Sequence, residues 1–182
     1  ILGNYITNES VIRNEIISDE GDPYNEILFN KSINNIKSRN IFKTVKTNIK
    51  EGSSNQLKVV DVVVEEKPTG EISAGAGTGT SGSSISFSIA ENNYMGKGSK
   101  VNLSATLSDD SVEGRFRISE PNFRNSDKTL NTTIESSRND LMSKFGYETN
   151  ETGFSFGTTF EQYQDIFFSP ELSMYYESLT TS

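Results

Sequence analysis

The side chains that most often carry enzyme chemistry are missing from this sequence of 182 residues. It has no cysteine and no histidine, which excludes thiolate and imidazole metal sites, catalysis by a cysteine or histidine, and a disulfide framework. We therefore expect a protein that is not an enzyme and that needs no cofactor or metal. The chemistry that remains is recognition, by charge or by backbone hydrogen bonds.

An acidic segment, Ser18-Asp-Glu-Gly-Asp22, is the candidate for recognition by charge. Asp19, Glu20 and Asp22 lie just before the expected start of a helix, where carboxylates can pair with arginine on another protein. Acids in this position also act as partners of the helix dipole, or form an ordinary solvated loop. Both interpretations remain open.

The residues before Pro68 mix helical and strand patterns, which predicts a small α/β module. Its expected elements are a short helix from Thr7 or Asn8 to Ile17, a second helix from Asp22-Pro23 or Asn25 to Asn40, strands Ile41–Lys50 and Leu57–Glu66 around a turn at Gly52–Asn55, and Ile1-Leu2 as the stub of a leading strand. Apolar residues at helical or alternating spacing should form its core: Val11, Ile12, Ile16, Phe29, Ile33, Ile36, Val60, Val62 and Val64.

After Gly70 the sequence alternates polar and apolar residues almost without interruption, which predicts strands with two different faces. We expect about seven strands: Glu71–Thr80, Ser84–Ala90, Val101–Leu107, Val112–Ile118, Thr129–Ser137, Gly153–Gln162 and Phe167–Ser178. Pro170 interrupts the last of them, because proline cannot donate to a central ladder. The predicted domains are therefore residues 1–69 and 70–182.

The predicted strands suit a membrane β-barrel, although a soluble β-sandwich gives similar alternation. One face of each strand is crowded with serine, threonine, asparagine and charged residues, while the other carries isolated apolar residues, as expected when lipid covers one side. Arg115 and Arg117 would then face the lumen. Tyr94, Phe123 and Phe167 stand at strand ends, where they suit an interfacial girdle.

Several motifs in register resemble proteins of the BamA-type outer-membrane insertase family. Asp61-Val-Val-Val-Glu-Glu-Lys-Pro-Thr-Gly70 resembles the last strand of a terminal POTRA domain and its junction with the barrel. The family's first barrel strand and its first two periplasmic turns resemble Gly75–Gly82, Glu91–Gly98 and Ser119–Phe123. Upstream, Gly3-Asn4, Glu20-Gly-Asp22 and Asn40-Ile-Phe42 fit the POTRA pattern.

The resemblance implies an α+β POTRA domain of β-α-α-β-β order with a truncated first strand, followed by antiparallel transmembrane β-barrel strands of a partial barrel. We expect the chain to be part of a longer protein of the Gram-negative outer membrane, with residues 1–69 in the periplasm. The implied function is the assembly and insertion of other barrels. The implied partners are the lipid bilayer, nascent outer-membrane proteins, accessory lipoproteins of the BAM complex and periplasmic chaperones.

The first barrel strand is the candidate for backbone recognition, because an incomplete strand edge presents unpaired N–H and C=O groups that an incoming strand can satisfy. The residues expected to pair with a client strand are Ile72, Ser73, Ala74, Gly75, Ala76 and Gly77. The glycines would weaken side-chain packing and allow close backbone approach. They could instead relieve crowding in a curved barrel wall, or belong to the turn with Gly82.

The resemblance also gives Glu20 a role, since it matches an acidic residue through which the family's POTRA domain contacts the accessory lipoprotein. Two alternative functions remain: a related POTRA-barrel transporter for autotransporters or secreted proteins, and a soluble β-sandwich binding module. Nucleic acid is not an expected partner, because the formal net charge is -8 and the lysines are interspersed with acids.

Overall fold

The computed structural model describes residues 1–54, 57–79 and 82–181, and divides the chain into two compact units. Unit 1 contains Ile1–Thr69 together with the turn Asn92–Gly98. Unit 2 contains Gly70–Glu91 and the residues from Ser99 onward. No helix in the described part of the chain is both long and apolar enough to cross a membrane.

Unit 1 is a pair of helices packed on a small sheet. Its elements are α1 (Glu9–Arg13), α2 (Glu26–Ser38), β1 (Phe42–Glu51) and β2 (Lys58–Glu66), and Leu2 adds a parallel bridge to Val63. The Asn25 side chain accepts hydrogen bonds from the backbone N–H groups of Ile27 and Leu28, which makes it the N-cap of α2. The prediction that Ile1-Leu2 is the stub of a leading strand is confirmed by this bridge.

The core of unit 1 contains most of the predicted apolar residues, together with Ile41 and Phe42, which the predicted core did not include. Ile12 and Ile36 are fully buried, and burial of such a side chain contributes about 1.5–3 kcal/mol. The complete buried cluster is Val11, Ile12, Ile33, Ile36, Ile41, Phe42, Val62 and Val64. Ile16, Phe29 and Val60 pack against it at partial burial.

The first helix is shorter than predicted, because α1 ends at Arg13 instead of Ile17. The amides of Glu15 and Ile16 bond to carbonyls three residues back, to Ile12 and Arg13, so the chain leaves the helix through a tight turn. Of the predicted turn Gly52–Asn55, Asn55 lies outside the described residues, as does Thr80 of the strand Glu71–Thr80.

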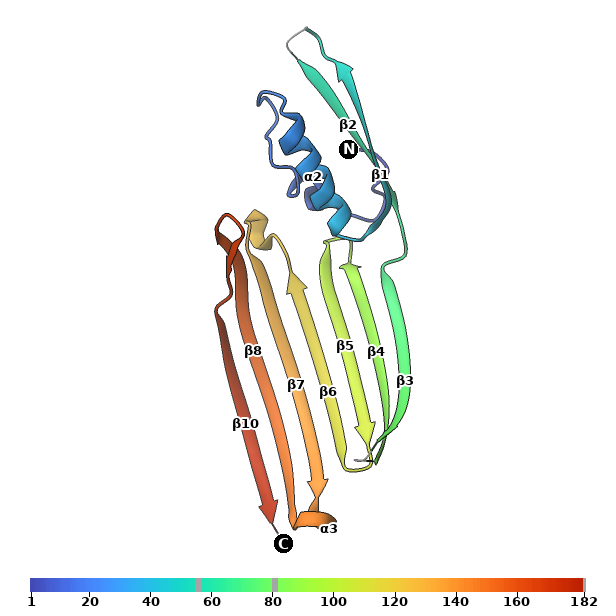
Figure 1. The fold of residues 1–182 in the computed structure, drawn as a ribbon, viewed down its shortest axis with the longest axis vertical. Helices are drawn as coiled ribbons and strands as arrows, with labels where there is room; N and C mark the ends of the chain where they lie inside the picture. The colour runs from blue at the N-terminus through green and yellow to red at the C-terminus, as the bar shows by residue number, and fades with distance from the viewer. Residues whose placement is uncertain (55–56, 80–81, 182) are drawn as a thin grey trace. The chain divides into compact units, whose positions relative to one another are not determined.

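Unit 2 is one layer of antiparallel strands in the order β10-β8-β7-β6-β5-β4-β3 (Figure 1). The strands are β3 (Gly70–Gly79), β4 (Gly82–Tyr94), β5 (Ser99–Ser108), β6 (Ser111–Glu120), β7 (Thr129–Leu141), β8 (Tyr147–Tyr163), β9 (Ile166–Phe168) and β10 (Glu171–Thr181), with η1 (Phe123–Asn125) after β6 and α3 (Met142–Phe145) after β7. A single layer differs from the two packed sheets that the β-sandwich alternative requires.

The last predicted strand, Phe167–Ser178, is divided in two. The short β9 pairs with β8 through Phe168 and Phe160, and β10 begins after Ser169 and Pro170. Pro170 has no N–H to donate, but its carbonyl still accepts a hydrogen bond from the Thr158 amide at 3.1 Å. The described sheet consequently has eight strands with β9 included.

The two faces of the sheet have opposite character along its whole width. Leu103, Phe116, Ile134, Phe154 and Met174 are register partners across β5, β6, β7, β8 and β10, and they form one apolar row. The neighbouring row, on the other face, is Ser104, Arg115, Glu135, Gly153 and Tyr175. This arrangement is that of a membrane barrel wall, with an apolar outer face and a polar lumen.

Candidate functional site

The six residues predicted to pair with a client strand all lie on β3, which forms one edge of the described sheet. Within the described residues β3 pairs with β4 alone, from Gly70 opposite Glu91 to Gly79 opposite Gly82. All ten residues of β3 are exposed. The main-chain groups along the free edge can therefore accept and donate hydrogen bonds to an added strand.

The side chains of β3 are small and divide between two faces. Ile72, Ala74 and Ala76 pair with Ile89, Phe87 and Ile85 on the apolar face. On the polar face, the Ser73 and Ser88 hydroxyl oxygens lie 2.7 Å apart, and Gly75 and Gly77 stand opposite Ser86 and Ser84.

The glycines of β3 are not all required by packing against β4. A Cβ placed on Gly77 would lie 3.8 Å from the Ser84 Oγ atom, an ordinary contact, and a Cβ on Gly79 would meet no atom within 4 Å. Gly75 and Gly70 are closer, because their Cβ atoms would lie 3.1 Å from the Ser86 Oγ atom and 3.2 Å from the Glu91 Oε2 atom, which are ends of side chains. Crowding by β4 therefore does not explain the run of glycines.

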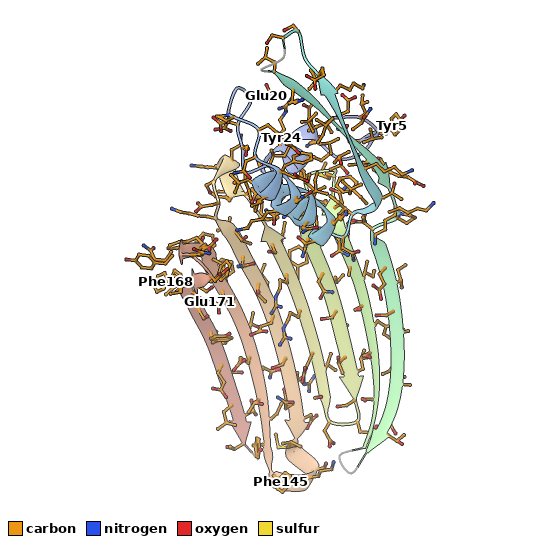
Figure 2. All side chains as sticks on the ribbon, turned by 45° about the horizontal axis from the view of Figure 1, so that its top comes forward. Tyr5, Glu20, Tyr24, Phe145, Phe168 and Glu171 are labelled. Atoms are coloured by element: carbon orange, nitrogen blue, oxygen red, sulfur yellow. The ribbon has the colours of Figure 1, made fainter. Side chains whose placement is uncertain are left out.

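The three predicted docking acids lie together in the loop between α1 and α2. Asp22 supports the loop itself, because its carboxylate accepts a hydrogen bond of 3.0 Å from the Asp19 amide. The Glu20 side chain is 85% exposed, and its carboxylate pairs with the Arg13 guanidinium at 2.6 Å. Figure 2 labels Glu20 in this loop, before Tyr24.

The ion pair between Arg13 and Glu20 changes the acidity of both groups. Its hydrogen bond, and secondarily its charge attraction, lowers the pKa of the Glu20 carboxyl and raises the pKa of the Arg13 guanidinium. Arg13 also contacts Glu9 at 2.7 Å. Glu20 is therefore a carboxylate at neutral pH that already has an arginine partner within the chain, which the sequence pattern did not reveal.

A second polar arrangement in unit 1, which sequence reasoning missed, centres on Glu66 at the end of β2. Its carboxylate accepts hydrogen bonds from three successive amides, those of Tyr5, Ile6 and Thr7, at 3.1, 3.0 and 2.6 Å. Burial acts to raise the pKa of Glu66, but the bonds from Thr7, Ile6 and Tyr5 outweigh it and hold the pKa below its ordinary value. Glu66 thus fixes the loop before α1.

The same loop binds the turn Asn92–Gly98, which belongs to unit 1. The buried Asn93 side chain donates to the Thr7 hydroxyl at 2.9 Å and accepts from the Gly98 amide at 2.8 Å. The Asn8 amide donates to the Gly96 carbonyl at 2.8 Å. The sequence analysis identified Glu91–Gly98 as a turn motif. It could not predict that this turn contacts Thr7 and Asn8, more than eighty positions away, because those contacts depend on the fold.

On the polar face of unit 2, three side chains connect four strands. The Arg115 guanidinium pairs with Glu135 at 2.8 Å, and the Tyr175 hydroxyl donates to the other oxygen of the same carboxylate at 3.1 Å. Gly153 lies between Glu135 and Tyr175 in register, and the tyrosine ring crosses it. The prediction that Arg115 faces the polar side agrees with this pairing. In the described residues no three carboxylates are grouped to hold a metal ion.

The geometry defines a class: a small α/β domain followed by the strands of a membrane-barrel wall, which in the described sheet begins at the edge strand β3. Comparison with known proteins agrees with it. The family model "Omp85 superfamily domain" matches residues 93–182, and the POTRA model "Surface antigen variable number repeat" matches residues 1–67. The chain belongs to the Omp85 superfamily and is similar to its BamA-type members.

Three known proteins illustrate the similarity. A provisionally named outer membrane protein assembly factor of Treponema pallidum (strain Nichols) is 26% identical over 148 residues, covering 78% of this chain and 18% of the relative. The crystal structure of BamA from Haemophilus ducreyi lacking POTRA domains 1–3 has a TM-score of 0.83 at 22% identity, covering 98% of this chain and 35% of that one. CdiB from Acinetobacter baumannii has a TM-score of 0.56 at 12% identity, covering 98% of this chain and 37% of that one.

Members of this superfamily are outer-membrane proteins with periplasmic POTRA domains, which confirms the predicted location. The chain is in the outer membrane, with residues 1–69 on the periplasmic side. The predicted fold, a POTRA domain followed by part of an antiparallel barrel, is confirmed as well. The chain spans about a fifth of the length of the Treponema relative.

Proposed function

We propose that this chain acts in the folding and insertion of β-barrel proteins into the outer membrane, without a chemical reaction, and that β3 is the template for client strands. The observation that carries the proposal is the free edge of β3, an exposed strand paired on one side only in the described sheet. Membership of the Omp85 superfamily supports a role in assembly or transport at this membrane.

The free edge has a physical reason to bind a strand. An unpaired N–H or C=O group in hydrocarbon costs several kcal/mol, so a client strand that pairs with β3 relieves a penalty on both chains. The small side chains of Ala74, Gly75, Ala76 and Gly77 add little packing to these hydrogen bonds. Binding would then depend mainly on the backbone, which suits many client sequences and allows release.

Cysteine crosslinking tests the template. The chain contains no cysteine, so Ser73→Cys introduces a single thiol on β3, and a client barrel protein can carry one cysteine in its terminal strand. We expect a disulfide-linked adduct with Ser73→Cys. The matched control is Ser88→Cys, on the same face and 2.7 Å away but on β4, which should give only background. Equal adducts from both variants, or assembly that proceeds normally without an adduct, would contradict the proposal.

The acidic loop is proposed as the docking site for an accessory lipoprotein. Glu20 is the best placed of the three acids, because its side chain is 85% exposed and already pairs with an arginine, whereas the Asp22 carboxylate accepts from the backbone of its own loop. An arginine of the partner would join or replace Arg13 at this carboxylate. Such charge-assisted bonds are shorter and stronger than neutral ones.

Substitutions at Glu20 and at Arg13 should have opposite effects on binding of the lipoprotein, and this difference tests the docking site. Glu20→Lys should reduce co-purification of the lipoprotein with the full-length protein, since it reverses the charge that the partner's arginine meets. Arg13→Ala is the informative companion, because it releases Glu20 from its 2.6 Å ion pair and should increase recovery of the partner. Recovery that is unchanged in both variants, in quantitative pull-downs at low and high salt, would discard the idea.

A related transporter remains the alternative within the superfamily. The likeness to CdiB, with a TM-score of 0.56, supports the shared fold and does not distinguish the two functions. The crosslinking experiment separates them by the identity of the captured strand. A barrel that remains in the membrane supports assembly, and a secreted chain in transit supports transport.

A further inference from the structure

The edge strand β3 is weakly held along its second half. The hydroxyl groups of Ser73 and Ser88, which link β3 to β4 at 2.7 Å, lie in the half nearer the start of β3. Beyond them, Gly75, Gly77 and Gly79 have no side chains with which to bond or pack. Contacts at the far end of the β3–β4 hairpin therefore matter more for the position of β3.

The far end of this hairpin is at the outer side of the membrane. Residues 1–69 are periplasmic and β3 follows them, so β3 runs from the periplasmic end of the sheet to the outer end. In the antiparallel sheet β5 runs in the same direction as β3, and the turn between β5 and β6 is at the outer end as well. Figure 1 shows this turn at the same end of the sheet as α3.

Asp109, in the turn between β5 and β6, bonds to the β3–β4 hairpin. Its carboxylate oxygen Oδ2 accepts a hydrogen bond of 3.0 Å from the Ser83 amide, near the start of β4. Gly82 makes room for this side chain, because a Cβ on Gly82 would lie 2.3 Å from Oδ2 and 3.3 Å from Cβ of Asp109. Gly82 also has a φ of 107°, a conformation that favours glycine. The two turns thus fit together through a residue of each.

The next residue, Asp110, bonds in the opposite direction across the sheet. Its carboxylate pairs with the Lys144 ammonium on α3, and its carbonyl oxygen accepts from the Asp140 amide at 2.8 Å. The turn between β5 and β6 is therefore bonded to the β3–β4 hairpin on one side and to the end of β7 on the other. Because β7 pairs with both β6 and β8, this turn has a fixed base in the sheet.

We propose that Asp109 is a positioning residue for the template, which holds the outer end of the β3–β4 hairpin in the barrel wall while β3 receives a client strand. This inference rests on the proposed templating by β3. A carboxylate is a stronger acceptor than a neutral oxygen. Its bond is made to Ser83 of β4, so it fixes the hairpin and leaves the edge of β3 open. Without this bond the outer half of β3 separates from the wall more often, and client pairing there becomes weaker.

Amide hydrogen exchange of the full chain in phospholipid nanodiscs tests the positioning without a client. Asp109→Ala removes the acceptor, and we expect peptides from Ser83–Phe87 to exchange roughly five-fold faster, as for the loss of one hydrogen bond. Asp109→Asn keeps an oxygen acceptor and should restore most of the protection.

Asp110→Ala is the matched control for this exchange measurement, because it removes an acid from the same turn and leaves the bond from the Ser83 amide in place. We expect it to leave exchange in Ser83–Phe87 unchanged. Unchanged exchange in Asp109→Ala would overturn the proposal. Equal acceleration in Asp109→Ala and Asp110→Ala would overturn it too, because the effect would then belong to the turn as a whole.

Crosslinking to a client barrel protein tests the consequence for the template. Gly77→Cys places a thiol in the outer half of β3, where a Cβ would lie at an ordinary distance of 3.8 Å from the Ser84 Oγ atom. Ser73→Cys places one nearer the periplasm. In the Asp109→Ala background we expect the Gly77→Cys adduct to fall about five-fold, the Ser73→Cys adduct to fall less than about two-fold, and Asp109→Asn to restore both.

Two results of the crosslinking would count against Asp109. Adducts at Gly77→Cys that are equal with and without Asp109, or adducts that fall equally at both cysteines, would overturn its action on the outer half of β3. Absence of adducts at both cysteines with Asp109 intact would instead contradict templating by β3. The exchange measurement, which uses no client, then still decides whether Asp109 holds the hairpin.

Discussion

Replacement of Gly96 by alanine is expected to destabilise unit 1 by about 2–4 kcal/mol. Gly96 has a φ of 72°, in the left-handed region that disfavours a side chain. A Cβ on this residue would lie 2.1 Å from the Ile6 carbonyl oxygen, which belongs to backbone and has little freedom to retreat. The contact would push apart the loop and the turn that the Asn8 amide and the Asn93 side chain hold together.

Amide hydrogen exchange of the full chain measures this effect, because it reports the opening of one unit without unfolding the other. A loss of about 2–4 kcal/mol corresponds to exchange that is roughly 30-fold to 900-fold faster in peptides from α2 and β2. Peptides from β7 and β8, in unit 2, serve as the internal reference.

Gly21→Ala is the matched control for the cost of placing a side chain on a residue with positive φ. Gly21 also has a positive φ, of 102°, but a Cβ there would meet no atom within 4 Å. We expect this variant to cost only about 1 kcal/mol of local strain. If Gly96→Ala and Gly21→Ala accelerate exchange in α2 equally, close packing of the turn Asn92–Gly98 does not stabilise unit 1.

The second large effect is expected at Gly153, in the polar row of unit 2. A Cβ on Gly153 would lie 2.3 Å from Cε1 of the Tyr175 ring. The ring would have to swing away, which would break the 3.1 Å hydrogen bond from the Tyr175 hydroxyl to Glu135. We expect Gly153→Ala to lower the free energy of unfolding by about 1–3 kcal/mol, from lost ring packing and a lost bond to a charged acceptor.

Urea unfolding of the full chain in detergent micelles, followed by circular dichroism, measures this loss. Gly114→Ala is the control, since a Cβ on Gly114 of β6 would meet no atom within 4 Å, and its effect should stay within about 0.5 kcal/mol. Tyr175→Phe keeps the ring and removes only the hydrogen bond.

Gly153→Ala and Tyr175→Ala should not be additive, because both remove the same ring from the same place. Additive losses would mean that the ring does not cross Gly153 in the membrane. If the two losses are not additive, the contacts from Arg115 to Tyr175 hold the register of the four strands β6, β7, β8 and β10.

Local patterns were sufficient for most of the architecture. The spacing of Ile33 and Ile36 predicts the buried side of α2, and the alternation of Val60, Val62 and Val64 predicts the inner face of β2. The free-edge strand was predicted within one residue at its start. The beginning of β8 was missed, because residues 147–152 are polar on both faces and carry no apolar period.

What the sequence by itself determined is the order of the elements, the two faces of the barrel strands and the position of β3 after the POTRA module, because each depends on residues only a few positions apart. The tertiary structure alone decided which distant groups meet. In the structure Glu20 pairs with Arg13, Gly96 packs against the Ile6 carbonyl, and the Tyr175 ring packs over Gly153. These contacts depend on the path of the backbone between the partners, which no local pattern contains.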